Sequence, residues 1–225
     1  MTQVDQITAP LSMRDSVSTN GSFDDRLIRC LDVVIALLAL ILLAPVLGLI
    51  AVAVRISGGG PLIFKQQRVG KGGAVFPCYK FRTMRIDAEK VLATLLASDP
   101  VIRAEWARDH KLRNDPRVSK IGNLLRRTSL DELPQLLNVL QGRMSIVGPR
   151  PITERECIRY GRYFEFYLAV RPGITGVWQV SGRSSTTYRR RVACDIVYAR
   201  TRSLATNVRI IAVTIPMVLL ARGAY

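Results

Sequence analysis

The chain has 225 residues, which is enough for one well-packed core or for one compact domain with an accessory segment. Lysine and arginine number 33 against 17 acidic residues, and the net charge of +16 indicates a polyanionic partner: nucleic acid, an anionic membrane surface or a phosphorylated substrate. A hydrophobic content of 48% is high for so basic a nucleic-acid binder and favours membrane association, while a single histidine and four scattered cysteines argue against most zinc sites.

Residues 1–25 are polar and show no sustained apolar period, so we predict a flexible N-terminal tail there. An uncharged apolar run follows from Val33 to Val54, long enough at about 1.5 Å per residue to cross the roughly 30 Å hydrocarbon core of a bilayer. A signal peptide would have a shorter apolar region and a small-residue cleavage site, whereas Arg55 follows this run. We therefore predict a membrane helix over residues 26–57.

The membrane helix is predicted to bend at Ala44 and Pro45, near the midpoint of the apolar run. Pro45 removes one helical hydrogen bond and pushes the preceding turn away. Basic residues flank both ends of the run, so the charges do not assign the two ends to opposite sides of a membrane. A re-entrant helix, which enters and leaves by the same face, is favoured, and a single span with a proline kink is the alternative.

Two short segments after the apolar run, residues 62–65 and 74–81, predict a β-hairpin around the glycine-rich stretch 69–73. That stretch lacks the spacing and the hydroxyl residue of a phosphate loop, so we interpret it as a turn. Residues 85–112 show a helical apolar pattern that breaks near Pro100.

Two adjacent carboxylates, Asp131 and Glu132, lie just downstream of Arg126 at the start of a further predicted helix. Carboxylates beside guanidinium groups suggest phosphate chemistry with a metal ion. In a purely structural alternative, Ser129 is the N-cap of the helix and Glu132 closes a capping box. Pro134 favours the first helical position, which would leave both carboxylates in the preceding turn, free to face a ligand. In either case we expect the helix N-terminus to favour their ionised forms.

Basic residues on rigid backbone are the best candidates for phosphate binding, because the guanidinium fork is then held in place for bidentate contacts. Arg150 lies between two prolines, Arg183 follows a glycine, and Lys80 and Arg82 flank a phenylalanine at a strand end. The arginine run 189–191 is expected to face solvent or anionic lipid instead.

The last apolar segment, residues 208–220, is too short to span a bilayer and contains Pro216. We predict an interfacial or core helix over residues 207–225. The whole chain is thus expected to be an α+β protein, mostly helical, with a re-entrant membrane helix and a small catalytic domain over residues 58–206 that contains the short β-hairpin.

The chain resembles the bacterial sugar transferase family, the monotopic phosphoglycosyl transferases that begin exopolysaccharide and O-antigen synthesis. The resemblance extends from about residue 26 to the C-terminus and is strongest to the short branch that includes undecaprenyl-phosphate galactose phosphotransferases of the succinoglycan type. Six motifs carry it and occur in the order seen in the family: Lys80–Met84, Asp115–Arg117, Thr128–Gln135, Gly148–Pro151, Arg171–Gly176 and Gly223–Tyr225.

The resemblance implies a re-entrant helix bent at a Ser-Pro or similar pair, here Ala44-Pro45. It places the protein in the bacterial inner membrane, with the catalytic domain facing the cytoplasm. It also implies that Asp131 is the nucleophile and that Glu132 is its partner at Mg²⁺. Phosphate and uridine contacts are implied for arginines, and we assign them to Arg126, Arg150 and Arg183, with Lys80 and Arg82 as further candidates.

The implied reaction transfers a sugar 1-phosphate from a UDP-sugar to undecaprenyl phosphate and releases UMP, through a covalent aspartyl-phosphosugar intermediate. Galactose or glucose is the expected sugar, and an N-acetylated sugar for O-antigen, capsule or glycoprotein synthesis is the alternative. Membrane lipids are expected partners, nucleic acid is not, and a homodimer is left open. The rival from another class is a membrane-tethered nucleic-acid-binding or scaffold protein, which the charge permits and which would need neither carboxylate.

Overall fold

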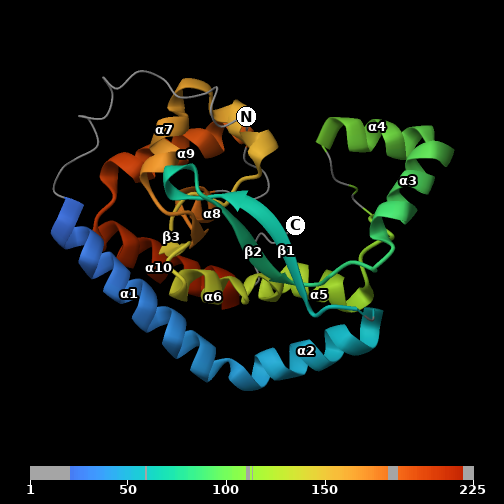
Figure 1. Cartoon of the computed structure of the whole chain (residues 1–225), viewed down its shortest axis with the longest axis horizontal. Coiled ribbons are helices and arrows are strands. Elements are labelled where there is room, and N and C mark those ends of the chain that lie inside the picture. The colour runs from blue at the N-terminus through green and yellow to red at the C-terminus, as the bar shows by residue number, and fades with distance from the viewer. Residues whose placement is uncertain (1–20, 59, 110–111, 113, 182–186, 220–225) are drawn as a thin grey trace.

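The computed structural model describes residues 21–58, 60–109, 112, 114–181 and 187–219. Over these residues the fold is mostly helical, with two small two-stranded sheets (Figure 1). This confirms the mostly helical class expected from the sequence. The helices are α1 (Gly21–Leu42), α2 (Ala44–Gly58), α3 (Ala88–Ser98), α4 (Pro100–Asp109), α5 (Lys120–Thr128), α6 (Gln135–Leu140), α7 (Phe164–Ala169), α8 (Val177–Val180), α9 (Tyr188–Thr201) and α10 (Leu204–Leu219). The strands are β1 (Ile63–Val69), β2 (Val75–Phe81), β3 (Ser145–Val147) and β4 (Gly173–Thr175).

The predicted β-hairpin is present as the antiparallel pair β1–β2. Its turn is a single 3-10 turn, Lys71–Gly73, in which Gly72 and Gly73 have φ angles of 68° and 82°. Such left-handed angles suit glycine, which has no Cβ to clash with the backbone. The glycine-rich stretch is therefore a turn, as predicted.

A second sheet, which the sequence did not predict, joins two glycine–proline motifs. Strands β3 and β4 pair in parallel, and just beyond them Gly148 N–H donates to the carbonyl of Thr175 at 2.8 Å. A Cβ atom at Gly148 would lie 2.3 Å from the carbonyl oxygen of Arg171, and one at Gly176 would lie 2.2 Å from that of Gly148. The two backbones approach so closely that only glycine fits, and the turn bearing Arg150 is fixed by this contact.

Helix α1 begins at Gly21, so the prediction of a tail over residues 1–25 is wrong for its last five residues; residues 1–20 lie outside the described part of the chain. The physical reason is an ionic anchor at the start of the helix. Asp25 pairs with Arg202, which lies just after α9, and its other oxygen is 4.0 Å from Lys71 in the hairpin turn. At the other end of the chain, α10 begins three residues before the predicted boundary at 207.

The apolar run forms two helices, α1 and α2, that meet at Leu43 and Ala44 with a bend of 64°. Figure 1 shows them as a shallow V whose arms both rise toward the rest of the molecule. The bend follows from Pro45, which has no N–H to donate to the carbonyl one turn earlier. Within the described residues no single helix has the length and apolar composition to cross a membrane, and α1 with α2 qualifies only as a bent pair.

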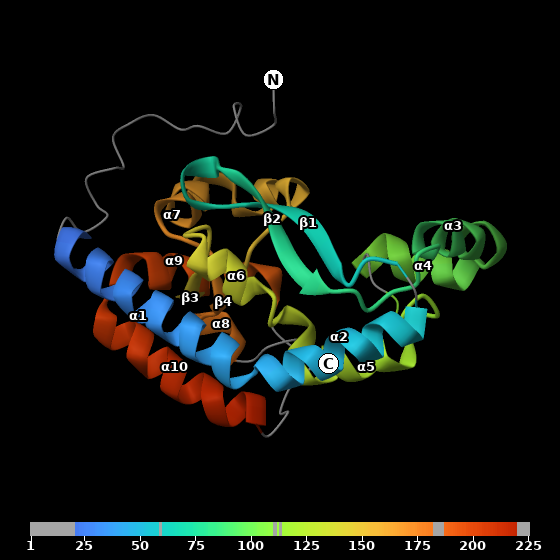
Figure 2. The same ribbon diagram turned by 60° about the horizontal axis from the view of Figure 1, so that its bottom comes forward.

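Helix α1 is also part of the protein core. Ile28 and Ala36 are buried, and Figure 2 shows the helix alongside α10 and below α6. The main core lies between α1, the hairpin, α6 and α9, and includes Phe76, Val139 and Tyr198. By contrast α3 and α4, which break at Asp99 as predicted, extend away from this core (Figure 2).

Candidate active site

Asp131 and Glu132 lie in a one-turn 3-10 segment, Leu130–Glu132, between α5 and α6. Ser129 ends α5 in the left-handed conformation, with φ 59°, and its side chain caps no helix. Pro134 has helical φ and ψ and immediately precedes the first residue of α6. The capping-box alternative is therefore wrong, and the placement predicted from Pro134, with both carboxylates in the turn before the helix, is confirmed.

The turn is fixed against the hairpin by two contacts. Lys80 Nζ lies 2.5 Å from Glu132 Oε1. Six residues further on, the fully buried side chain of Asn138 pairs with the backbone of β2. Its Oδ1 accepts from Tyr79 N–H at 2.9 Å, and its Nδ2 donates to the carbonyl of Pro77 at 2.8 Å. Strand β2 thus holds both the first residues before α6 and its middle turn.

Asp131 is almost fully buried, and burial raises the pKa of its carboxyl to about 6. The neighbouring Glu132 adds to the rise, while the cations of Lys80 and Arg126 oppose it. We expected the helix N-terminus to favour the ionised form of Asp131, but desolvation outweighs these attractions and raises the pKa. With a pKa of about 6 the carboxyl is still mostly ionised at neutral pH. The result is a carboxylate that titrates near pH 6 and is correspondingly more basic than an exposed aspartate.

Glu132 has the opposite shift. Burial by itself would raise its pKa, but the cations of Lys80, Arg150 and Arg68 outweigh burial, so the pKa of Glu132 lies below its ordinary value. The pKa values of the two neighbouring carboxyls are thus shifted in opposite directions: that of Asp131 is raised and that of Glu132 is lowered. Such a pattern is found where acidic groups have different chemical roles.

Of the basic residues predicted from the sequence, three act on the carboxylates. Lys80 is bonded to Glu132, Arg150 lowers the pKa of Glu132, and Arg126 lowers that of Asp131. Arg126 is itself positioned by a hydrogen bond of 2.9 Å from its Nε to Thr83 Oγ1. These cations leave a surplus of positive charge around two carboxylates, which suits a substrate with several negative charges.

The remaining predicted residues are placed differently. Arg82 donates from Nε to the carbonyl of Pro61 at 2.9 Å, and among the described residues it makes no hydrogen bond or ion pair with Asp131 or Glu132. Arg183 lies outside the described residues.

Arg68 is a site residue that the sequence reasoning missed. Its guanidinium donates to the carbonyl of Pro151 at 2.9 Å and lies 3.3 Å from Glu156, and its charge reaches Glu132. The signal was available in the period of two along the hairpin: Arg68 pairs with Phe76, whose side chain is buried, so the arginine must share the buried face.

The three arginines of the run 189–191 differ in their exposure to solvent. Arg189 and Arg190 are exposed, as expected, but Arg191 is partly buried and stacks on the ring of Trp178, 4.6 Å from its centroid. The expectation of a solvent-facing run is therefore wrong for Arg191. The helical period explains this, because α9 turns one residue in each three or four toward the core.

Asp131 and Glu132 offer the carboxylate oxygens that suit Mg²⁺. Within the described residues no three carboxylate, cysteine or histidine side chains form a cluster that could hold a metal ion. Mg²⁺ commonly takes only one or two protein carboxylates and completes its shell with water and substrate phosphate. The residues therefore fit an ion that is shared with a phosphorylated substrate.

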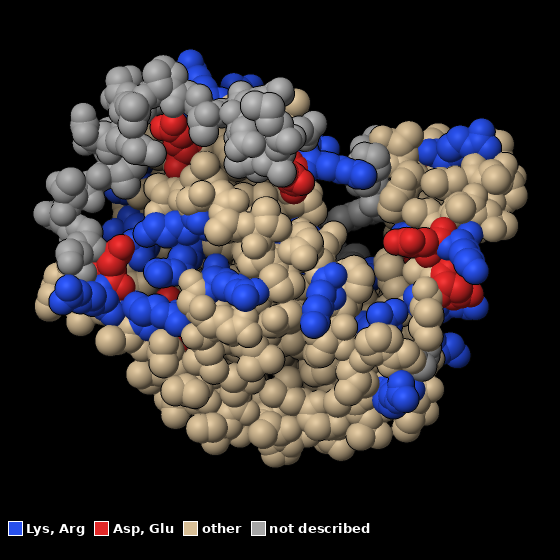
Figure 3. Space-filling view, in the orientation of Figure 1, with Lys and Arg blue, Asp and Glu red and all other residues tan. Residues whose placement is uncertain are grey.

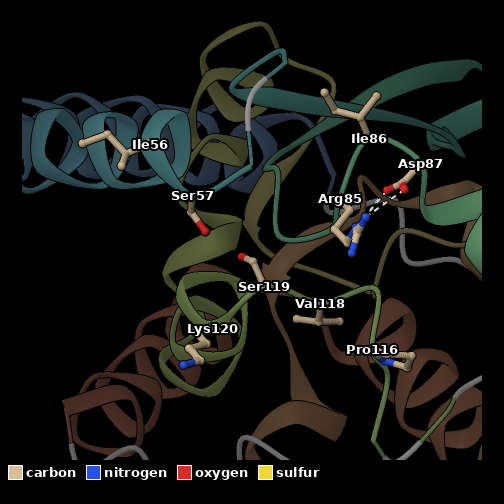
Figure 4. A pocket seen from close by; sticks show the side chains of 9 residues that line it. All are labelled: Ile56, Ser57, Arg85, Ile86, Asp87, Pro116, Val118, Ser119 and Lys120. Atoms are coloured by element: carbon tan, nitrogen blue, oxygen red, sulfur yellow. Dashed lines mark hydrogen bonds and ion pairs between the residues drawn. The ribbon is translucent and has the colours of Figure 1, made fainter.

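An open pocket of about 670 Å³ lies elsewhere, between the end of α2, the Arg85–Asp87 turn and the start of α5 (Figure 4). In it Arg85 forms a two-bond ion pair with Asp87, and Ser119 Oγ accepts the N–H of Gly122 as the N-cap of α5. Arg85 and Asp87 pair with each other, and the pocket brings together no two carboxylates, so the candidate active site remains the Asp131–Glu132 turn.

A profile described as bacterial sugar transferase matches residues 23–221 of the chain. The exopolysaccharide production protein ExoY of Sinorhizobium fredii is 48% identical over 197 residues, which cover 88% of this chain and 87% of that protein. The undecaprenyl-phosphate galactose phosphotransferase of Salmonella typhimurium is 47% identical over 197 residues, and the UDP-glucose:undecaprenyl-phosphate glucose-1-phosphate transferase of Escherichia coli is 40% identical over 205 residues. Each of these two alignments covers 88% of this chain but only 41% of the longer relative.

Proposed function

Because the chain belongs to the bacterial sugar transferase family, we propose that it transfers a sugar 1-phosphate from a UDP-sugar to undecaprenyl phosphate and releases UMP. The observation that carries the proposal is the Asp131–Glu132 turn, in which one carboxyl is made basic by burial and the other is held ionised by surrounding cations. The names of similar proteins supply the substrate class. Such a reaction would be the first membrane step of exopolysaccharide synthesis.

In the proposed first step, a carboxylate oxygen of Asp131 attacks the β-phosphorus of the UDP-sugar. The bond from that phosphorus to the bridging oxygen breaks, and UMP leaves with the electron pair. In the second step, an oxygen of undecaprenyl phosphate attacks the same phosphorus and the bond to Asp131 breaks. The product is an undecaprenyl diphosphosugar, and the free carboxylate is restored. Covalent catalysis suits this pair of substrates, because the water-soluble donor and the membrane-bound acceptor need not occupy the site together.

The cations around the turn have separate roles in this scheme. Lys80 keeps Glu132 ionised, and Arg126 lies close enough to Asp131 to offset the repulsion between the attacking carboxylate and an anionic phosphate. Mg²⁺, held by Asp131 and Glu132 together with the diphosphate, would neutralise further substrate charge. Arg150 would stabilise the charge that develops on the departing phosphate.

The acceptor is a lipid, and the shape of the molecule is suited to a membrane surface. Around the bend between α1 and α2 the visible surface carries no charged side chain, while Lys and Arg gather above it (Figure 3). We propose that this apolar face lies in one leaflet of the bacterial inner membrane, with the catalytic residues on the cytoplasmic side. Large apolar side chains exposed on these two helices include Leu37, Leu38, Ile41, Leu42, Leu49 and Val52.

The step order makes a prediction that tests the proposed function. Purified protein mixed with UDP-sugar and Mg²⁺, without lipid acceptor, should release a burst of UMP equal to the amount of enzyme. The measurement is rapid-quench UMP release, run across UDP-galactose, UDP-glucose and the N-acetylated donors, and the donor with the largest burst identifies the sugar.

Asp131→Asn is the control in this assay and should give no burst. A burst that appears only after polyprenyl phosphate is added would replace the covalent scheme with direct transfer. Transfer that survives in Asp131→Asn would remove Asp131 as the nucleophile.

A further inference from the structure

Trp178, on the short helix α8, lies against two arginines that come from different parts of the chain. The indole is buried, with 5% of its surface exposed, and the guanidinium of Arg191 on α9 lies 4.6 Å from its ring centroid. The guanidinium of Arg150, from the Gly-Pro-Arg-Pro turn, lies 5.9 Å from the same centroid. One aromatic ring therefore brings two cations into the same neighbourhood.

Polar atoms around this ring lack partners. Among the described residues, Trp178 Nε1, Arg191 Nε and Gln179 Oε1 are buried and make no hydrogen bond. Buried polar groups are nearly always hydrogen-bonded, because an unpaired one loses its bonds to water without compensation. Two of these atoms, Trp178 Nε1 and Arg191 Nε, carry N–H donors, and they indicate a place where the acceptor atoms of a ligand supply the missing bonds. Gln179 Oε1 is an acceptor and does not contribute to binding such a ligand.

The electrostatics of the cluster point to an anion. Burial lowers the pKa of Arg191, and the like charge of Arg150 lowers it further. Arginine stays charged even so, which means that the half-buried guanidinium of Arg191 is held near that of Arg150, which is exposed. Arg150 also lowers the pKa of Glu132, so the cluster adjoins the candidate active site.

We propose that Arg150, Arg191 and Trp178 form a phosphate-binding subsite beside the Asp131–Glu132 turn. Arg191 is the new member: it contributes a guanidinium fork to one phosphate group, and the indole fixes the plane of that fork. The proposal rests on the proposed function only for the source of the phosphate, which is either the nucleotide part of the donor or the head of the lipid acceptor.

The protein offers a direct measurement of binding, because it contains only two tryptophans. Trp106→Phe leaves Trp178 as the sole indole reporter inside the proposed subsite. In this background, tryptophan fluorescence is titrated with inorganic phosphate, UMP, UDP-galactose and a short-chain polyprenyl phosphate in detergent micelles. A saturable change with UMP and UDP-galactose assigns the subsite to the donor, and a change with polyprenyl phosphate alone assigns it to the acceptor. No saturable change with any of the four would overturn the proposal.

Three variants in the same background separate binding from packing. Arg191→Gln should weaken binding of the effective ligand at least about tenfold, because a charge-assisted contact is lost. Arg191→Lys should recover only part of the affinity, since lysine keeps the charge but not the planar fork. Arg190→Gln, at the exposed neighbour, removes the same charge and should leave affinity within about twofold.

Equal losses in Arg190→Gln and Arg191→Gln would reduce the effect to overall charge and contradict the subsite. Thermal melting of each variant shows whether the fold is retained, and Arg191→Lys keeps the test decisive if Arg191→Gln does not fold. A protein that binds UMP through Arg191 but releases none from any UDP-sugar would contradict the proposed function and leave the subsite standing. A UMP burst that is unaffected by Arg191→Gln, together with unchanged binding, would do the reverse.

Discussion

At the scale of single residues, the candidate site depends on what burial does to two adjacent carboxyls. Asp131 is withdrawn from water and its pKa rises to about 6, whereas Glu132 contacts Lys80 at 2.5 Å and its pKa falls. Ser129, immediately before the turn, is the one residue other than glycine with a positive φ among the described residues. Local strain of this kind is common where the backbone must present a functional side chain.

Asp131→Asn should stabilise the protein while it abolishes transfer. The folded-state pKa of about 6 lies above the ordinary 3.8, so folding favours the protonated carboxyl, and ionisation costs the folded state free energy at neutral pH. At about 1.4 kcal/mol per pKa unit, the variant should gain up to about 3 kcal/mol of unfolding free energy above pH 6. Denaturant unfolding at pH 8 and at pH 4 checks the sign. A gain that is equally large at pH 4 would mean that charge burial is not its cause.

The pH dependence of transfer should show Asp131 directly. A nucleophilic carboxylate must be ionised, so kcat/KM should fall about tenfold for each pH unit below about 6. Lys80 is the largest of the charges that lower the pKa of Asp131, and Lys80→Gln should therefore move this acidic limb to higher pH. Steady-state rates from pH 4.5 to 8.5 measure both profiles. Superimposable acidic limbs in the two proteins would exclude Asp131 as the titrating group.

At the scale of secondary-structure elements, α6 is held at its middle and at its C-terminal end. In the middle of α6, the side chain of Asn138 is hydrogen-bonded to the backbone of the hairpin. At the C-terminal end of α6, Arg29 on α1 donates to the carbonyls of Val139 and Leu140 at 2.7 and 3.0 Å. Asp32, one helical turn after Arg29, accepts from Ser145 Oγ and from the N–H of Ile146. The helix that begins the apolar run is thereby joined to the helix that follows the Asp131–Glu132 turn.

Asn138→Ala should lower both stability and turnover. It leaves the N–H of Tyr79 and the carbonyl of Pro77 unpaired in a buried contact, at a cost of about 2–4 kcal/mol. The turn bearing Glu132 would then lose its alignment with Lys80, and kcat should fall while KM for the donor changes little. Asn123→Ala, at an exposed position on α5, is the matched control. If both variants unfold at the same denaturant concentration, Asn138 does not clamp α6 to the hairpin.

At the scale of the whole molecule, the bend of 64° leaves the outer ends of α1 and α2 on the side of the catalytic domain (Figure 1). The apolar side chains surround the bend, and the charges lie above it (Figure 3). This separation favours a re-entrant helix pair in one leaflet, because a straight span would carry one end away from the catalytic domain.

Labelling from the two sides of the membrane tests this topology. Cys30 on α1 is exposed and unbonded, and Ser57→Cys places a second exposed thiol near the end of α2. An impermeant maleimide should label both thiols in inside-out membrane vesicles and neither in right-side-out vesicles. Cys30→Ser, with and without Ser57→Cys, separates the two signals. Labelling of one thiol in each orientation would establish a true span.

Local patterns determined much of this protein from the sequence alone. The apolar run with Pro45, the glycine-rich hairpin turn, the break before Pro100 and the position of the carboxylates relative to Pro134 were all predicted and found. Each depends on the backbone properties of one or two residues, such as the missing N–H of proline or the φ angles that glycine permits. These properties follow directly from the residue type. The order of the motifs likewise indicated the sugar transferase family, which the match over residues 23–221 confirms.

The tertiary structure decided what depends on partners distant in the chain. Burial, rather than the helix end, sets the pKa of Asp131, and burial is a property of the assembled core. The charge of Arg68, on a strand and 64 positions before Glu132, acts on Glu132 because Arg68 shares the buried face of the hairpin. Arg191 belongs to an arginine run expected to be solvated, yet it stacks on Trp178. Charge and composition could not separate these two arginines from the other basic residues, because only packing fixes which of them lose water and face the site.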